Sequence, residues 1–310
     1  MVKLAFVFPG QGSQFVGMGK DLYDNYEEAK KVFDDVDKIL GKSISKICFE
    51  GSEEDLKQTI NTQLAILTTS LAALAALKSR LNVEPAFVAG HSLGEYGALC
   101  EAGVLSFEDT IKLIAKRAVL MSQLKNGAMS AILGLDDVTV EECIKEAQEV
   151  GYVAVANYNC PGQVVITGEE RALRDAEELL MASGARRIIP LAVSGAFHSE
   201  LMKNAGEEFG KYLQGFELHD AKVPVITNVD AQITTNAQDF REKIPRQIYS
   251  SVYWTQSVQK MVNEGVDTFV EIGPGKVLVG LIKKIAPEMK VYNVYDKTSL
   301  NACVEAIKII

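Results

Sequence analysis

The order of apolar and polar stretches along the chain predicts that strands and helices alternate. An apolar strand at 4–8 is followed by helical stretches at 18–40 and 62–81, a strand at 86–90, and helices at 93–102 and 107–123. The stretch from Leu64 to Leu77 is rich in alanine and leucine and interrupted by hydroxyl side chains, which suits a helix inside a large core. This alternation favours a parallel sheet covered by helices.

The pattern changes at Gly127. Strands are predicted at 128–134, 152–157, 163–167 and 186–191, and helices at 138–150 and 169–183. The order β-α-β-β-α-β is that of a ferredoxin-like unit. Beyond residue 193 the first pattern resumes, with helices at 200–214, 238–249, 255–264 and 276–285, strands at 223–228, 268–272 and 291–294, and a final helix. We therefore expect a small subdomain at 125–194, inserted into a large subdomain formed by 1–124 and 195–310, with the site in the cleft between them.

Composition narrows the classes of partner and location. The 310 residues carry a formal net charge of −9, which has the wrong sign for binding a polyphosphate backbone, so nucleic acid is not expected as a partner. The five cysteines are scattered singly, which favours a reducing, cytoplasmic setting. The opening apolar run ends at Pro9-Gly10, too early for a signal peptide or a membrane span, so we expect no membrane association.

The segment from Gly90 to Gly94 reads Gly-His-Ser-Leu-Gly, a G-x-S-x-G sequence between an apolar strand and a helical stretch. This is the context of a nucleophile elbow, in which a strained turn exposes the serine hydroxyl beside the next backbone N–H. Ser92 is therefore the candidate nucleophile. An ordinary glycine-bounded turn is the alternative.

A serine nucleophile needs a base, and the chain offers three histidines. His91 adjoins Ser92, so the backbone direction makes it difficult for its ring to reach the hydroxyl. His219 lies in a polar connection and is expected to be solvated. His198 lies in a loop of small residues where the chain returns to the large subdomain, and it is the candidate base.

Two further segments leave alternatives open. The turn Gly10-Gln11-Gly12 is not a dinucleotide-binding loop, because Phe15 occupies the position of the third glycine. Its backbone N–H groups either supply an oxyanion donor beside that of Leu93 or form a plain tight turn. In the helix at 107–123, Arg117 or Lys116 can point inward, and the pattern alone favours a solvated Arg117.

Together, these segments resemble the malonyl-CoA:acyl-carrier-protein transacylases of dissociated bacterial fatty acid synthesis. The resemblance is collinear over the chain and rests on Phe-Pro-Gly-Gln-Gly-Ser-Gln (8–14), Gly-His-Ser-Leu-Gly-Glu (90–95), Arg117, Asn-Tyr-Asn-Cys-Pro-Gly-Gln (157–163), Gly-Ala-Phe-His-Ser (195–199), Gln247 and Glu-Ile-Gly-Pro-Gly-Lys-Val-Leu (271–278). It implies an α/β-hydrolase-like core with the ferredoxin-like insertion, malonyl-CoA as substrate, and a transient partnership with holo acyl carrier protein. It implies no bound cofactor, and the spacing of histidines and cysteines predicts no metal site.

The resemblance also implies a role for each candidate residue. Ser92 would accept the malonyl group in a ping-pong scheme, with His198 as acid and base and the Gln247 backbone carbonyl orienting the imidazole. The N–H groups of Gln11 and Leu93 would bind the oxyanion.

The same resemblance assigns the substrate contacts. Arg117 would hold the malonyl carboxylate. Phe197 would select against a 2-methyl branch, unless it only packs. For the carrier protein we expect a basic rim at Arg186, Arg187, Lys276, Lys283 and Lys284. The rival interpretations are a serine thioesterase or hydrolase, a stand-alone acyltransferase serving a polyketide synthase, and a non-catalytic interaction module.

Overall fold

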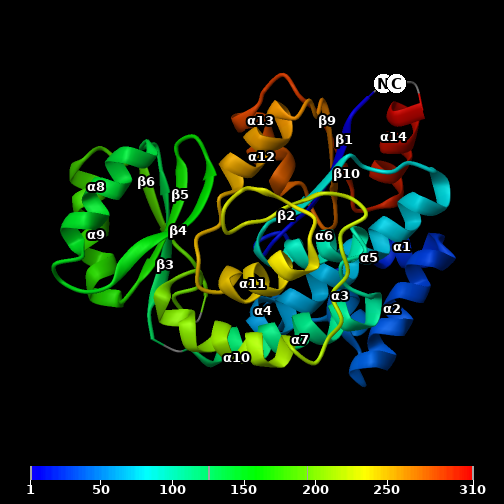
Figure 1. Cartoon of the computed structure of the whole chain (residues 1–310), viewed down its shortest axis with the longest axis horizontal. Helices are drawn as coiled ribbons and strands as arrows, with labels where there is room; N and C mark the ends of the chain where they lie inside the picture. The colour runs from blue at the N-terminus through cyan, green and yellow to red at the C-terminus, as the bar shows by residue number, and fades with distance from the viewer. Residues whose placement is uncertain (1, 125, 194, 309–310) are drawn as a thin grey trace.

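The computed structural model describes residues 2–124, 126–193 and 195–308 and contains two sheets (Figure 1). The strands are β1 (Leu4–Phe8), β2 (Phe87–Gly90), β3 (Ala128–Leu133), β4 (Val153–Cys160), β5 (Gln163–Gly168), β6 (Arg187–Pro190), β7 (Val225–Ile226), β8 (Ile233–Thr234), β9 (Thr268–Ile272) and β10 (Lys290–Val294).

The helices lie between these strands in the alternation that the sequence predicts. They are α1 (Lys20–Asn25), α2 (Glu27–Leu40), α3 (Ile44–Glu50), α4 (Glu53–Lys57), α5 (Thr59–Arg80), α6 (Glu95–Glu101), α7 (Phe107–Gln123), α8 (Asp137–Ala147), α9 (Glu170–Ala182), α10 (Lys203–Leu213), α11 (Ala237–Gln247), α12 (Trp254–Asn263), α13 (Val277–Ile285) and α14 (Lys297–Lys308), with short 3₁₀ turns at Ser92–Gly94 and Glu200–Met202.

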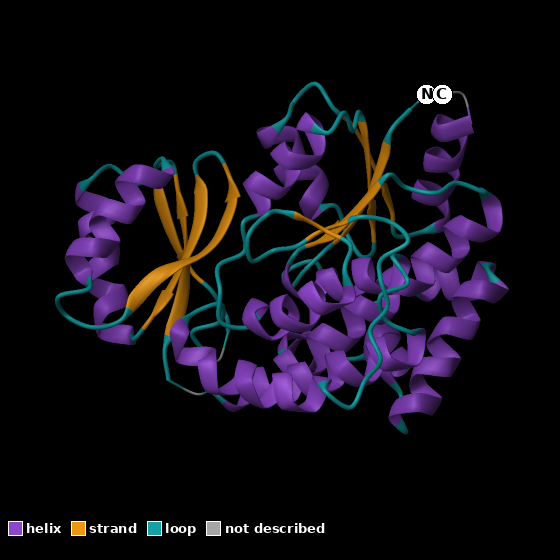
Figure 2. Ribbon diagram, viewed as in Figure 1, coloured by secondary structure: helices purple, strands orange, loops and turns teal. Residues whose placement is uncertain are grey.

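The larger sheet has the strand order β10-β9-β1-β2-β7-β8, parallel except for β8. Side chains of β1 alternate between two cores: Phe6 and Phe8 face the cluster that contains α5 and α7, whereas Ala5 and Val7 face α12 and α13. Burial on both faces explains the continuous apolar run of β1, as is usual for a parallel sheet. Figure 2 shows helices on both faces of this sheet. The predicted parallel-sheet core is confirmed.

The smaller sheet is antiparallel, with the order β4-β5-β3-β6, and α8 and α9 cover one of its faces (Figure 1). This is the connectivity and strand order of the predicted ferredoxin-like unit. Strand β4 joins the unit to the large core, because Tyr158 N–H donates to the Val252 carbonyl at 3.0 Å and Val252 N–H donates to that of Ala156 at 2.8 Å. The predicted subdomain junctions at residues 125 and 194 lie outside the described residues, and we retain the boundaries as a proposal.

Several predicted elements differ from the structure. The helix predicted at 18–40 is two helices separated by Tyr26, which adopts extended backbone although no glycine or proline marks the break. Helices α3 and α4 were not predicted; both are short, and their first turns are capped by Ser43 and Ser52. The strand predicted at 223–228 is confined to Val225–Ile226, because the chain turns at once to pair with β8.

Helix α5 is long and apolar enough to cross a membrane by length and composition. In the fold, 89% of its most apolar window is buried. The helix therefore lies in the core, as the pattern around Leu64–Leu77 predicts.

Candidate active site

The elbow forms where β1, β2 and β7 end together. Phe8 and Gly90 are register partners, so the segments that follow them leave the same edge of the sheet. Ser92 has φ 52°, in the left-handed region that non-glycine residues rarely adopt. A Cβ on Gly90 would lie 2.0 Å from the Gly94 backbone, and one on Gly94 would lie 2.1 Å from the Phe8 carbonyl oxygen. The two glycines are thus required by close backbone packing around the turn, and the predicted strand-turn-helix context of Ser92 is confirmed.

His198 meets the serine hydroxyl. Its Nε2 lies 2.7 Å from Ser92 Oγ, and its Nδ1 lies 2.9 Å from the Gln247 carbonyl oxygen and 3.2 Å from that of Ser250. A carbonyl only accepts, so Nδ1 carries the proton and Nε2 is left as the acceptor for the serine proton. His198 itself has φ 57°. Both members of the Ser–His pair are therefore held in a sparsely populated backbone conformation.

The surroundings of His198 keep its ring neutral. Burial, and after it the Arg117 charge, lower the pKa of His198 to about 3. The hydrogen bonds to the Gln247 and Ser250 carbonyls act in the opposite direction. The imidazole is therefore in the basic form throughout the neutral range.

Arg117 is buried, with 1% of its surface exposed, whereas Lys116 pairs with Glu208 at the surface. This corrects the solvated Arg117 that the helix pattern alone favoured. Its Nη2 donates to Ser92 Oγ at 3.0 Å and to Gln247 Oε1 at 3.0 Å, and its Nη1 donates to Gln63 Oε1 at 2.6 Å.

Arg117 is bound by neutral groups and has donor capacity left. Its Nε has no partner, and within the described ranges no carboxylate lies within ion-pair distance of the guanidinium. Burial lowers the pKa of Arg117. A buried guanidinium beside the nucleophile with no counter-ion in contact is a site for an anionic group.

Gln11 and Leu93 line the same pocket and come from the turns after β1 and β2. In the part of the chain that the structure describes, neither backbone N–H donates to an acceptor within the protein. Both donors thus remain available for an oxygen in the pocket.

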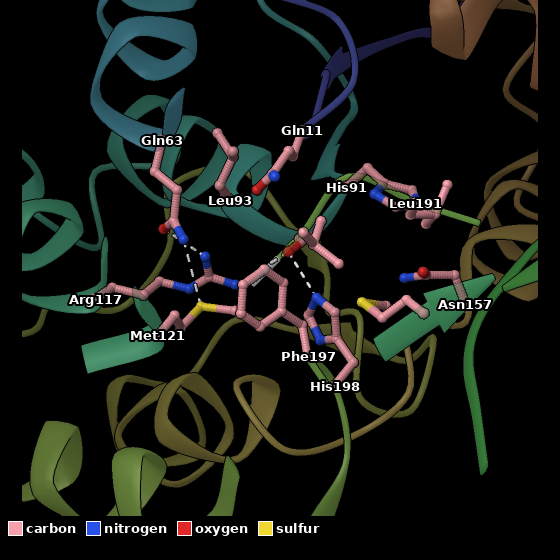
Figure 3. Close-up of a pocket in the computed structure, with 13 residues that line it drawn as sticks. Gln11, Gln63, His91, Leu93, Arg117, Met121, Asn157, Leu191, Phe197 and His198 are labelled. Atoms are coloured by element: carbon pink, nitrogen blue, oxygen red, sulfur yellow. Dashed lines mark hydrogen bonds between the residues drawn. The ribbon is translucent and has the colours of Figure 1, made fainter. Parts of the chain in front are cut away.

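The pocket has a volume of about 90 Å³. Figure 3 shows Gln11, Leu93, Arg117, Phe197 and His198 gathered around it. Phe197 is 5% exposed and belongs to the wall. The remaining lining is mostly apolar: Met121, Met129, Leu191 and Val193, with Gln63, His91 and Asn157 as polar members. The predicted residues Ser92, His198, Gln11, Leu93, Arg117 and Phe197 therefore all line this pocket. Gln247 does not line it but contacts both His198 and Arg117.

The other two histidines do not contact the Ser92 hydroxyl. His91 Nε2 lies 2.8 Å from Asn159 Oδ1, and its ring lies against Trp254. His219 is exposed. Both positions agree with the elimination made from the sequence.

Gln63, Asn228 and Glu95 were not predicted as site residues. Gln63 fixes Arg117, and its Nε2 donates to Met121 Sδ at 3.4 Å. Asn228, in the turn after β7, binds the backbone of the elbow. The sequence held a signal for each: one glutamine in an apolar helix, an asparagine at the end of the strand predicted at 223–228, and a glutamate at the end of the segment 90–95. Across the described residues, no group of three or more His, Cys, Asp or Glu side chains is placed to hold a metal ion.

Comparisons with known proteins agree with this geometry. Residues 5–300 match the model of the acyl transferase domain family. The chain is 46% identical over 312 residues to the malonyl CoA-acyl carrier protein transacylase of Bacillus subtilis, covering 99% of this chain and 98% of that protein. It is 45% identical to the Staphylococcus aureus protein of the same name, covering 95% of this chain and 96% of that protein.

Solved structures give the same picture. An acyl carrier protein S-malonyltransferase from Vibrio cholerae superposes with a TM-score of 0.94 at 42% identity, covering 97% of this chain and 99% of that one. A malonyl-transacylase in complex with its type II polyketide synthase acyl-carrier protein superposes with a TM-score of 0.95 at 39% identity, covering 98% and 99%.

Proposed function

The chain belongs to the acyl transferase family, together with the malonyl CoA-acyl carrier protein transacylases that it matches over nearly its whole length, and from this membership we propose that it transfers malonyl from malonyl-CoA to holo acyl carrier protein. The acceptor is the phosphopantetheine thiol, and the product supplies fatty acid elongation. The observation that carries the choice of acyl group is the buried Arg117 guanidinium, 3.0 Å from Ser92 Oγ and without a carboxylate partner. A malonyl group brings the carboxylate that this cation lacks.

In the proposed first half-reaction, Ser92 Oγ attacks the thioester carbonyl carbon while its proton passes to His198 Nε2. The carbonyl oxygen becomes an oxyanion that accepts from the N–H groups of Gln11 and Leu93. The carbon–sulfur bond then breaks, and His198 returns the proton to the departing CoA thiolate. The product is a malonyl ester on Ser92.

The second half-reaction runs the same steps in reverse order with the carrier thiol. His198 Nε2 takes the thiol proton, the sulfur attacks the ester carbonyl, and Ser92 Oγ leaves with that proton. The Gln247 carbonyl keeps the imidazole in the required tautomer throughout, a role supported by the 2.9 Å contact to Nδ1. The scheme uses no bound cofactor.

Phe197 and Arg117 are proposed to divide the work of acyl selection. Arg117 holds the carboxylate, and the Phe197 ring in the pocket wall opposes a branch at the malonyl 2-position. Because the carboxylate fixes where the rest of the acyl chain lies, a 2-methyl group has no second orientation in which to avoid the ring.

The carrier protein is proposed to dock on the basic rim at one end of the antiparallel sheet. Arg187 pairs in register with Leu133, Leu133 pairs with Gln163, and Lys284 Nζ donates to Gln163 Oε1 at 3.4 Å. Arg187 in β6 and Lys284 in α13 thus lie at the same end of this sheet. Both side chains are exposed. We also propose a cytoplasmic location, which is supported by five free cysteines.

Intact mass tests the function. Wild-type enzyme incubated with malonyl-CoA should gain one malonyl group, Ser92→Ala should gain none, and holo carrier protein should discharge the adduct onto its thiol. Arg117→Ala should lose the preference for malonyl over acetyl. An adduct that is lost to water at the same rate with and without carrier would instead favour the hydrolase interpretation.

A further inference from the structure

Asn228 is a fully buried polar residue in the turn that follows β7, two residues beyond the strand and beside the elbow. Its side chain contacts the backbone on both sides of His91. Oδ1 accepts the N–H of Ser92 at 2.8 Å, and Nδ2 donates to the Gly90 carbonyl oxygen at 2.7 Å. The amide therefore satisfies two peptide groups at the point where the chain leaves the β2 ladder.

These two bonds bear directly on the strain at Ser92. A non-glycine residue in the left-handed region is held there only when its surroundings fix it. A third bond comes from Gln247, whose Nε2 donates to the Ser92 carbonyl oxygen at 2.7 Å. Both peptide groups of Ser92 are thus bound by buried side-chain amides from the segment 228–247, far from the elbow in sequence.

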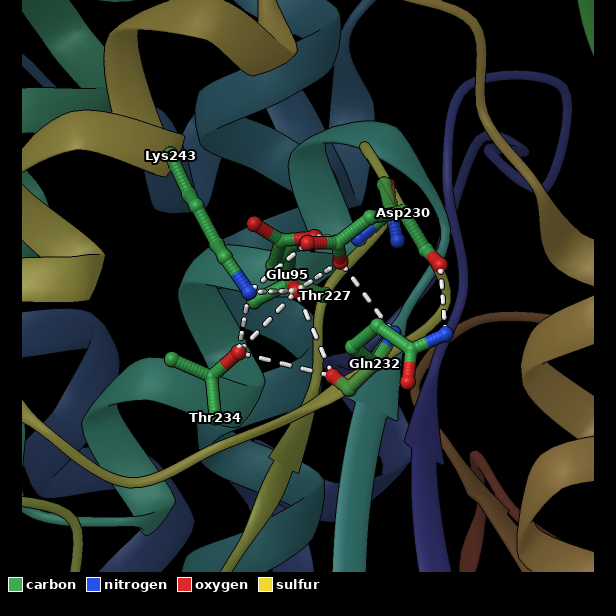
Figure 4. A network of polar contacts seen from close by, with 7 residues as sticks. Glu95, Thr227, Asp230, Gln232, Thr234 and Lys243 are labelled. Carbon is green, nitrogen blue, oxygen red and sulfur yellow. Dashed lines mark hydrogen bonds and ion pairs between the residues drawn. The ribbon is translucent and has the colours of Figure 1, made fainter.

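Asn228 is in turn fixed by its neighbours. Its backbone N–H donates to Glu95 Oε2 at 2.7 Å. The turn that follows is held by Lys243, which pairs with Asp230 at 2.8 Å and donates to Thr234 Oγ1 at 2.8 Å. Figure 4 shows Glu95 next to this network. These contacts hold the Asn228 backbone so that its side chain points at the elbow.

We propose that Asn228 is a positioning residue that locks the left-handed backbone of Ser92. In that conformation Oγ lies on His198 Nε2, and the following N–H, that of Leu93, stays without an internal acceptor. Glu95 serves the lock by holding the Asn228 backbone. The expected effect on kcat rests on the proposed function. The expected effect on the reactivity of the Ser92 hydroxyl does not.

An asparagine suits this position because it presents one acceptor and one donor in one plane. Aspartate keeps an acceptor for Ser92 N–H but sets a second acceptor oxygen against the Gly90 carbonyl oxygen, where the asparagine donates. Alanine loses both hydrogen bonds. Both substitutions should therefore lower the rate constant for acylation of Ser92.

The test measures covalent labelling of Ser92 by phenylmethanesulfonyl fluoride, a neutral reagent that needs neither Arg117 nor the carrier, together with KM and kcat for malonyl-CoA. Asn228→Ala should lower the labelling rate constant and kcat by about a hundredfold, the scale of a small misplacement of reacting atoms, with KM nearly unchanged. Asn228→Asp should also label more slowly than wild type. Melting temperatures are recorded for every variant.

The control is Asn236→Ala, which removes the N-cap of α11 on the same connection without touching the elbow. It should lower the melting temperature and leave Ser92 labelling at the wild-type rate. Should Asn228→Ala not fold, the comparison of Asn228→Asp with wild type decides. Wild-type labelling rates in folded Asn228 variants would overturn the lock. Slow labelling in the variants combined with absent malonyl transfer in wild type would retain the lock and reject the proposed function.

Discussion

Replacing Arg117 by methionine should raise the pH at which Ser92 loses its reactivity. Arg117 Nη2 and His198 Nε2 contact the same oxygen at 3.0 and 2.7 Å. The two nitrogens are therefore at most about 6 Å apart, and a charge on Arg117 and a charge on a protonated His198 at that separation repel each other by roughly 3 kcal/mol at an effective dielectric constant of about 20. An energy of that size changes the proton-binding constant of the imidazole by about two orders of magnitude.

The sign follows from the causes of the shift. The Arg117 charge is the second contribution, after burial, that lowers the pKa of His198 to about 3. Removing it favours the protonated imidazole, which cannot accept the serine proton. The acid limb of the labelling rate should therefore move to higher pH, by about two pH units. Methionine is chosen because its flexible apolar chain fills the space of the arginine stem.

The assay is the second-order rate constant for sulfonylation of Ser92 between pH 2.5 and pH 9, using phenylmethanesulfonyl fluoride, so that the range includes the wild-type midpoint expected near a pKa of about 3. A neutral reagent keeps the ionisation of substrate out of the profile. Loss of the Arg117 hydrogen bond to Oγ changes the plateau, whereas the charge effect changes the midpoint, so the two are separated. NMR titration of the three histidine rings gives the His198 ionisation directly.

Lys116→Met is the matched control, because it removes the neighbouring cation of α7, which pairs with Glu208 at the surface. Its profile should coincide with that of wild type. Identical midpoints in wild type and Arg117→Met would refute the electrostatic account. A wild-type midpoint at the ordinary pKa of histidine would do the same, because it would mean that burial does not penalise the charged ring.

Three further outcomes are expected. Phe197→Ala should raise the ratio of methylmalonyl to malonyl transfer about tenfold or more in a competition assay, as one methyl group in a pocket is worth about 1–3 kcal/mol; an unchanged ratio would assign the ring to packing alone. The substitutions Lys283→Glu and Lys284→Glu together should raise the KM for carrier protein and leave malonyl loading intact, and an equal loss in both half-reactions would reject the rim. Burial raises the pKa of Glu271 to about 7, so the folded state binds the extra proton between the unfolded pKa and 7. Wild type should therefore lose stability relative to Glu271→Gln as pH rises through that window in urea titrations, and parallel curves would contradict the raised pKa.

The sequence by itself determined the local structure of the elbow. Glycine is required at 90 and 94 because the backbone there packs against residues of the same turn and against the adjacent strand. The apolar strand before the turn and the helix after it can be predicted from their own residues. For the same reason β1, β9 and α7 have the predicted bounds, since each has a strong apolar pattern of its own. The small inventory of histidines then left His198 as the base candidate.

The tertiary structure decided which groups complete the site. Ser92 and His198 are 106 positions apart, and Ser92 and Asn228 are 136 apart, so their contacts depend on which strands end at the same sheet edge. The helix pattern, in which either Arg117 or Lys116 can point inward, wrongly favoured a solvated Arg117. Packing against Gln63 and Gln247 turns the guanidinium inward. Local propensity sets the turn and the helix, but the burial of charge and the pairing of amides are settled only when distant segments meet, because desolvation and hydrogen bonding act through space.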